Sequence, residues 1–237
     1  MPKPSRDPVA PAGASSERVI ARLEPLLLER RVRRMQAVLA GRSSHVAFVF
    51  ERMTDPHNLS AALRSLDAFS FQDVHLVAPG ERLGLSHLIT RGTDRWLTLH
   101  TAPDSAACLA ALQAEGYRVY ASEVAGADCV PLTALDFSRR TALVFGNEHA
   151  GVSDAVPALA DGRFHIPMRG FAESLNLSVA VAISAFHARR EVDRLRAQLP
   201  PGTEQGDPYV LSPERRRALY AEWLQRSVNR SEEILAR

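Results

Sequence analysis

Short apolar runs alternate with helix-like segments through the central part of the chain. Each run holds four or five mainly apolar residues, and together they predict strands at 46–50, 74–78, 96–99, 118–122, 142–146 and 164–167. Longer segments with apolar positions three and four residues apart predict helices at 58–69, 105–115, 153–159 and 175–199. Strands that alternate with helices in this way form a parallel sheet covered by helices on both faces, so we predict an α/β fold.

Helical extensions flank this region at both ends. A helix that starts near Pro25 is predicted to run to about Gly41, and Ser212 is placed to cap a last helix after a segment rich in Pro and Gly at 200–208. The first residues are rich in Pro, Ala and Ser, which favours disorder. We therefore divide the chain into a disordered tail at 1–16, a basic N-terminal helical extension at 17–44, the α/β domain at 45–199, and a linker with a C-terminal helical extension at 200–237.

The net charge of +2 conceals an uneven distribution. Residues 1–44 carry nine basic and four acidic side chains, residues 45–187 carry ten and fifteen, and residues 188–237 carry ten and eight. Because the central region is acidic, a polyanionic partner would be attracted mainly to the extensions. Four arginines of the N-terminal helix are candidates for that contact, with a solvated surface helix as the alternative: Arg30, Arg31, Arg33 and Arg34.

The rest of the composition is that of an ordinary globular protein, with 46% apolar and 24% charged residues. The N-terminus has no apolar segment typical of a secretory signal, and no stretch is apolar over the length that a membrane span needs. Cys108 and Cys129 lie far apart, without Cys-x-x-Cys spacing or a histidine cluster. We therefore predict reduced thiols, no bound metal, no membrane partner and a cytoplasmic location.

Three polar motifs follow three of the predicted strands. They are D-P-H-N-L-S-A-A-L-R at 55–64, A-L-V-F-G-N-E-H-A-G-V-S at 142–153, and F-H-I-P-M-R-G-F-A-E-S-L-N-L-S at 164–178. Ligands of open α/β sheets bind where strands give way to loops and helices, so the motifs are predicted to form one site. The spacing from Gly146 to Gly151 is that of a phosphate-binding loop, but Val152 replaces the required lysine, and no G-x-G-x-x-G follows a strand.

Local chemistry offers simpler roles for several motif residues. Asn58, Ser153 and Ser174 each stand where a side chain could cap the helix that follows. Arg64 alone indicates a surface arginine or an ion-pair partner, and Gly146 alone indicates a tight turn. The capping role of Ser174 can coexist with a functional one.

The three motifs, in this order and at this spacing, resemble the SPOUT class of S-adenosylmethionine-dependent RNA methyltransferases. Within that class they resemble the SpoU/TrmH family of ribose 2′-O-methyltransferases, over about residues 45–190, with smaller matches at 90–96, 119–122 and 158–162. The resemblance implies that the α/β domain ends in a deep trefoil knot, roughly at 141–185. Periodicity alone would not predict a knot, because knots are rare.

The resemblance also implies residue roles. S-adenosylmethionine would be bound in a bent pose by residues of the second and third motifs: Phe145, Gly146, Asn147, Gly151, Ile166, Pro167, Met168 and Leu175. The catalytic set would be Asn58, Arg64, Glu148, Ser174 and Asn176, with Glu148 anchoring Arg64 or Asn58, or forming a salt bridge within its own loop. A guanidinium is always charged in proteins and has no free lone pair, so electrostatic stabilisation suits Arg64 better than a role as general base.

The family resemblance implies a homodimer, formed through the knot region, that methylates RNA rather than DNA. The short basic N-terminal extension most resembles the TrmH branch, which methylates guanosine 18 in the D-loop of tRNA; members that act on rRNA usually carry a larger N-terminal domain. Glu173 departs from the glutamine expected in the tRNA-directed branch. The alternatives are an rRNA 2′-O-methyltransferase of the same family, a non-catalytic RNA-binding assembly factor on this fold, and an α/β enzyme for small nucleotides.

Overall fold

The structure is a computed structural model that describes residues 15–77, 92, 95–124, 126, 128–203 and 206–236. Within these residues the chain divides into two compact units. One unit lies within Ser43–Pro201, and the other combines the two ends of the chain, from Met1–Arg42 and Gly202–Arg237. The predicted tail lies outside the described residues up to position 14, as does most of the short match at 90–96.

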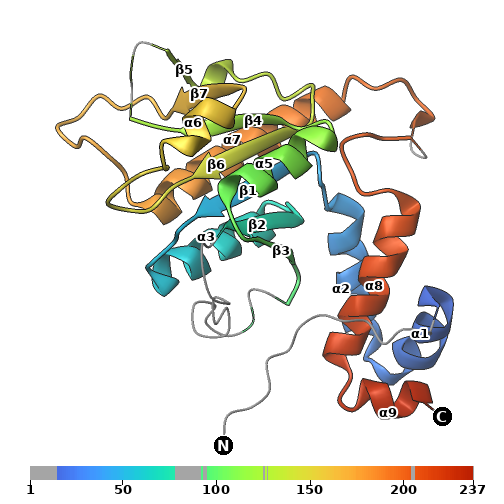
Figure 1. Cartoon of the computed structure of the whole chain (residues 1–237). Helices are drawn as coiled ribbons and strands as arrows, with labels where there is room; N and C mark the ends of the chain where they lie inside the picture. The colour runs from blue at the N-terminus through green and yellow to red at the C-terminus, as the bar shows by residue number, and fades with distance from the viewer. Residues whose placement is uncertain are drawn as a thin grey trace, which may run out of the picture. The chain divides into compact units, whose positions relative to one another are not determined.

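The first unit is built on a parallel sheet (Figure 1). Its seven described strands are β1 (Val46–Glu51), β2 (Asp73–Val77), β3 (Thr98–Ala102), β4 (Arg118–Ser122), β5 (Cys129–Pro131), β6 (Thr141–Phe145) and β7 (Gly162–His165). They lie in the order β3-β2-β1-β6-β4-β7-β5, and every pair is parallel. The predicted parallel sheet is confirmed. The knot implied for 141–185 stays a prediction.

Helices cover both faces of this sheet, as the alternating pattern predicted (Figure 1). The helices α3 (Pro56–Ala68) and α7 (Leu177–Arg196) pack together on one face. The helices α5 (Ser105–Ala114) and α6 (Ala155–Leu159) pack together on the other. A short 3-10 helix, η2 (Leu132–Ala134), follows β5. None of the described helices has the length and apolar character to span a membrane.

Both faces of the central strands are buried. Along β1, Ala47 and Val49 join a cluster that includes α5 and α6. Phe48, between them, points to the opposite face. Its ring centroid lies 5.1 Å from that of Phe71 and 6.3 Å from that of Phe145. Because no face of β1 meets solvent, its sequence is a continuous apolar run rather than an alternating one.

The two cysteines are free thiols in this unit. Cys108 is a buried residue of α5, and burial raises the pKa of its thiol to about 11. Cys129 lies in β5, where partial burial raises the pKa of its thiol. A thiol with a raised pKa has little thiolate character, so neither cysteine is set up as a nucleophile.

Three predicted helix caps are wrong. Asp55, not Asn58, caps α3. Pro56 takes the first helical position, and Asp55 Oδ1 accepts a hydrogen bond from His57 N at 2.8 Å. Asn176, not Ser174, caps α7. Helix α6 begins after Asp154 without a side-chain cap, and the neighbouring Ser153 binds a carboxylate instead. Asn58 and Ser174 are therefore free of the capping role that local chemistry offered them.

The second unit brings the two extensions together. It contains α1 (Ser16–Leu23), the 3-10 helix η1 (Glu24–Leu26), α2 (Glu29–Gly41), α8 (Pro213–Ser227) and α9 (Ser231–Ala236). Pro25 lies in η1, so the helix predicted to start near it begins at Glu29 instead, as α2, and α1 had not been predicted. The predicted cap Ser212 is confirmed, since its hydroxyl accepts a hydrogen bond from Arg215 N at 3.2 Å. The buried guanidinium of Arg42 lies 5.3 Å from the ring centroid of Trp223.

Candidate active site

Residues of the three motifs line one cavity beyond the carboxyl ends of the strands. The cavity has a volume of about 320 Å³, and we call it the motif cavity; its lining is Thr54, Asp55, Asn58, Glu148, His149, Ser174, Leu175, Asn176 and Leu177. It therefore brings together four of the five predicted catalytic residues. Thr54 and His149 were not predicted as site residues, although His149 belongs to the second motif and Thr54 directly precedes the first.

Hydrogen bonds fix the orientation of the amide groups in the motif cavity. Asn176 Nδ2 donates to Asn58 Oδ1 at 3.0 Å, and Asn58 Nδ2 donates to Glu148 Oε1 at 3.3 Å. The second carboxylate oxygen of Glu148 accepts from Thr54 Oγ1 at 3.3 Å. Of the partners proposed for Glu148 from the sequence, the structure provides Asn58. The result is a short relay from α7 through α3 to the loop after β6, with each donor and acceptor assigned.

Arg64 lies outside this cavity. It is exposed on α3, and its guanidinium forms no hydrogen bond or ion pair with the described residues. It lies six residues beyond Asn58, which corresponds to about 9 Å along the helix axis and about 240° around it. The structure of one chain therefore leaves the guanidinium available to an anion rather than placing it beside the amide relay.

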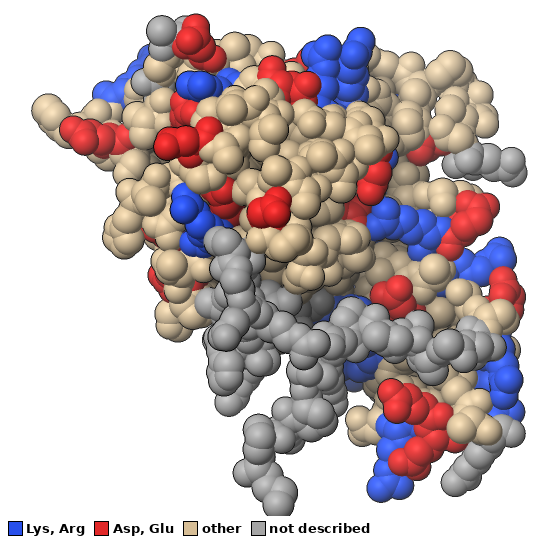
Figure 2. All heavy atoms as spheres, viewed as in Figure 1, with Lys and Arg blue, Asp and Glu red and all other residues tan. Residues whose placement is uncertain are grey.

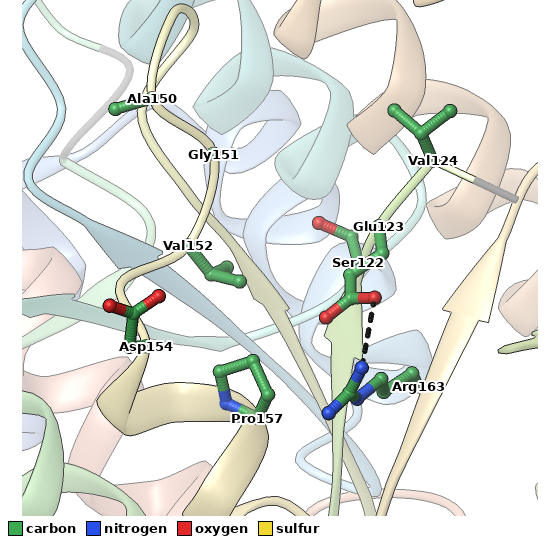
Figure 3. A pocket seen from close by; sticks show the side chains of 9 residues that line it. All are labelled: Ser122, Glu123, Val124, Ala150, Gly151, Val152, Asp154, Pro157 and Arg163. Carbon is green, nitrogen blue, oxygen red and sulfur yellow. Dashed lines mark ion pairs between the residues drawn. The ribbon is translucent and has the colours of Figure 1, made fainter. Parts of the chain in front are cut away.

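A second cavity lies beside the ends of β4 and β7 (Figure 3). Its volume is about 530 Å³, and we call it the strand-end cavity; its lining is Ser122, Glu123, Val124, Ala150, Gly151, Val152, Asp154, Pro157 and Arg163. Arg163 Nη1 pairs with Glu123 Oε2 at 3.5 Å, and Asp154 lies on the opposite wall (Figure 3). Only Gly151 had been predicted from this set. The match at 119–122 was the signal that could have pointed to Ser122.

The eight residues predicted to hold the cofactor do not surround a single cavity. Gly151 lines the strand-end cavity and Leu175 lines the motif cavity. The Phe145 ring is buried in the core against Phe50 and Phe164, so only its backbone could contact a ligand. The remaining five line neither cavity: Gly146, Asn147, Ile166, Pro167 and Met168. Their contact with a cofactor stays a prediction.

The loop between the two cavities closes on itself, and this explains Gly146. Asn147 and Gly151 exchange two backbone hydrogen bonds, both of 2.9 Å, and Gly151 has a φ of +67°. A Cβ atom at Gly146 would lie 2.1 Å from the carbonyl carbon of Gly151. The tight-turn interpretation of Gly146 therefore has a direct steric cause.

Glu51, at the end of β1, was missed by the sequence analysis. Its side chain is buried and accepts hydrogen bonds from Ser153 N at 2.7 Å, from Ser153 Oγ at 2.6 Å and from Ser105 Oγ. Burial raises the pKa of the Glu51 carboxyl, but the hydrogen bonds together lower it by more, so the pKa lies below its ordinary value. Glu51 is therefore ionised at neutral pH, and it is the carboxylate that Ser153 binds in place of capping α6.

Known proteins share both the sequence and the fold of this chain. The model of the SpoU rRNA Methylase family matches residues 45–186. A tRNA (guanosine(18)-2′-O)-methyltransferase of Thermus thermophilus is 36% identical over 198 residues, which cover 84% of this chain and 97% of that protein. The Escherichia coli protein of the same name is 32% identical over 161 residues, which cover 68% and 70% of the two chains.

Two solved structures extend the comparison to three dimensions. The Aquifex aeolicus TrmH/SpoU tRNA modifying enzyme has a TM-score of 0.71 at 27% identity, covering 84% of this chain and 98% of that one. The SpoU methyltransferase AviRb of Streptomyces viridochromogenes, in complex with the cofactor AdoMet, has a TM-score of 0.54 at 27% identity, covering 65% and 59%.

The loop geometry makes a prediction for Gly146→Ala. The added methyl group would overlap the Gly151 backbone, so the loop must open, and we expect a loss of about 1–3 kcal/mol in the free energy of unfolding. Amide hydrogen exchange at Gly151 should become faster, because its N–H would lose the Asn147 carbonyl. Gly170→Ala is the matched control, since a Cβ there meets no atom within 4 Å. Equal exchange rates at Gly151 in both variants would contradict this account of the loop.

Proposed function

The chain belongs to the SpoU methylase family, and we propose that it transfers the methyl group of S-adenosylmethionine to the 2′-hydroxyl of guanosine 18 in tRNA. The family match covers the sheet and all three motifs. The observation that supports the reaction is the motif cavity, in which polar residues of the three motifs meet beside a second, ligand-sized cavity. Relatives that are 36%, 32% and 31% identical to this chain are named for this tRNA position.

The strand-end cavity has the chemistry that S-adenosylmethionine needs. Val124, Val152 and Pro157 give it apolar walls, and the Glu123–Arg163 pair offers charges of both signs to a zwitterionic amino-acid group. When bound, the cofactor supplies a methyl group that is already activated by the positive charge on its sulfur. The protein therefore has to hold the two reactants in line and assist removal of one proton.

The amide relay is suited to holding a ribose. Asn58 and Asn176 are fixed in orientation by their mutual hydrogen bond, and the Glu148 carboxylate remains an acceptor on the same wall. Ser174 adds a hydroxyl that can donate or accept. A guanidinium carries a fixed positive charge, so we assign Arg64 to binding a phosphate and to stabilising negative charge on the 2′-oxygen as the hydroxyl loses its proton.

The basic extension supports tRNA as the substrate. Arg30, Arg31, Arg33 and Arg34 are all exposed on α2, where Arg33 pairs with Glu29 and Arg31 Nη2 lies 3.4 Å from Ser227 Oγ. Figure 2 shows basic and acidic side chains interspersed over the visible face of this unit. We assign these arginines to phosphate contacts. Replacing them with glutamine should make the affinity for tRNA depend less steeply on salt concentration. Of the alternatives, a non-catalytic binding protein would have no need for an intact amide relay.

The exposed surface of α7 supports a homodimer. Val179, Ile183 and Phe186 form an apolar stripe along one side of the helix, with Phe186 half exposed. We assign a second copy of the chain to this stripe, because α7 starts next to Asn176 and a partner there would border the motif cavity. We also propose a cytoplasmic location, which fits a tRNA-modifying enzyme and which labelling of the protein in cells would check.

Light scattering tests the dimer. We expect a mass near twice 26.0 kDa for the wild type, and a shift towards the mass of one chain for Ile183→Glu, because a charge would be buried at the interface. Val130→Glu places the same charge at an exposed valine in β5 and should leave the mass unchanged. A wild-type mass of one chain would contradict the assignment.

Substitution of Arg64 tests the proposed reaction. With labelled S-adenosylmethionine and unmodified tRNA, the wild type should transfer label to the 2′-oxygen of guanosine 18. Arg64→Ala should lose transfer by about 100-fold or more, as expected for removal of a charge-stabilising group, while cofactor affinity is retained. The matched control is Arg118→Ala, an exposed arginine at the opposite end of the sheet. If Arg64→Ala kept full activity, the assignment of Arg64 to the active site would be contradicted.

A further inference from the structure

Glu51 is a buried carboxylate to which the proposed chemistry assigns no role. Its exposed fraction is 2%, and its three hydrogen bonds connect three separate segments: the end of β1, the first turn of α5 through Ser105, and the loop after β6 through Ser153. Burying a charge costs several kcal/mol unless hydrogen bonds compensate for it. An apolar residue here would avoid that cost but would leave the Ser153 N–H and both hydroxyl groups without this acceptor.

The same loop is attached a second time, at its other end. Asn147 Nδ2 donates to the Arg52 carbonyl oxygen at 3.1 Å and to Thr54 Oγ1 at 3.2 Å. The loop is therefore attached at both ends: Ser153 binds Glu51 at the end of β1, and Asn147 binds the segment that follows β1. Because both ends are held by a rigid strand end, the residues between them have little freedom to move.

The residues between the two attachments divide the two cavities. Glu148 and His149 line the motif cavity, and Ala150, Gly151 and Val152 line the strand-end cavity. The loop is thus the shared wall of the proposed ribose and cofactor sites. Any shift of this wall changes the distance between the methyl donor and its acceptor.

We propose that Glu51 is a positioning residue for methyl transfer, which holds the Asn147–Ser153 loop in register so that the two cavities present their ligands in line. The identity of the two ligands rests on the proposed function, whereas the position of the loop is independent of that function. The carboxylate acts through Ser153 and touches neither ligand. A glutamine replaces it only in part. Its Oε1 can accept from the Ser153 N–H, but its Nε2 then donates where the carboxylate accepts, so both hydroxyl groups have to turn round to receive it and the negative charge is lost.

Glu51→Gln tests the proposal with two readouts. Amide hydrogen exchange of the protein without ligands should become faster across residues 148–152. The turnover rate should fall about 10- to 100-fold, as expected for a misplaced reactant, and affinity for S-adenosylmethionine by calorimetry should weaken, while affinity for tRNA is unchanged. Unchanged exchange together with unchanged turnover would overturn the proposal.

Tyr117→Phe is the control for a general loss of stability. It removes the hydrogen bond from Tyr117 Oη to the Ser44 carbonyl oxygen, of 2.6 Å, at the opposite end of the strands. It should lower the melting temperature without changing loop exchange or cofactor affinity. If it reproduced the effects of Glu51→Gln, the role of Glu51 would be structural only and the proposal would fail.

Ser153→Ala keeps the test informative if Glu51→Gln does not fold. It retains the backbone N–H bond and removes one hydroxyl bond, so it should give the same changes at smaller size. In the double variant the losses should be less than additive, because both changes remove the same attachment. Fully additive losses would count against a shared mechanism. A wild type that binds the cofactor but methylates no tRNA would refute the proposed function, whereas loop exchange and cofactor affinity would still decide the role of Glu51.

Discussion

The attachment of one loop to the end of β1 is the constraint on which the site depends. The loop carries a wall of each cavity, yet it has no regular secondary structure of its own to hold it. Its position comes from the buried Glu51 carboxylate, from Asn147 and from the backbone contact that only a glycine at 146 permits. The apolar core makes this possible, because a strand buried on both faces provides a fixed end to which polar groups can be tied.

The two units divide the work by charge. The α/β unit is acidic and contains both cavities, while the basic excess lies in the extensions. In the proposed function, long-range attraction of a polyanion is therefore separate from the chemistry, which we assign to oriented amides and a carboxylate rather than to net positive charge.

The sequence predicted the sheet and most strand positions because a strand such as β1, buried on both faces, has a distinctive apolar run. It did not predict β5, since Cys129–Pro131 is too short to show a pattern. The motifs identified Asn58, Glu148, Ser174 and Asn176, which meet in one cavity. The caps failed because Asp55, Asn58 and Asn176 have equivalent capping chemistry, and only the backbone path decides which one is used. Glu51 was missed because a carboxylate at the end of an apolar run usually marks exposure, and its burial depends on Ser105 and Ser153, which are distant in sequence.

The most direct test of the account is methyl transfer to a single tRNA position in two chemical forms. One transcript carries guanosine at position 18, and the other carries 2′-deoxyguanosine there, so that the two differ by the proposed acceptor atom alone. The account predicts label in 2′-O-methylguanosine at position 18 of the first transcript and no label in the second. Equal labelling of both transcripts, or label confined to rRNA offered in parallel, would contradict it.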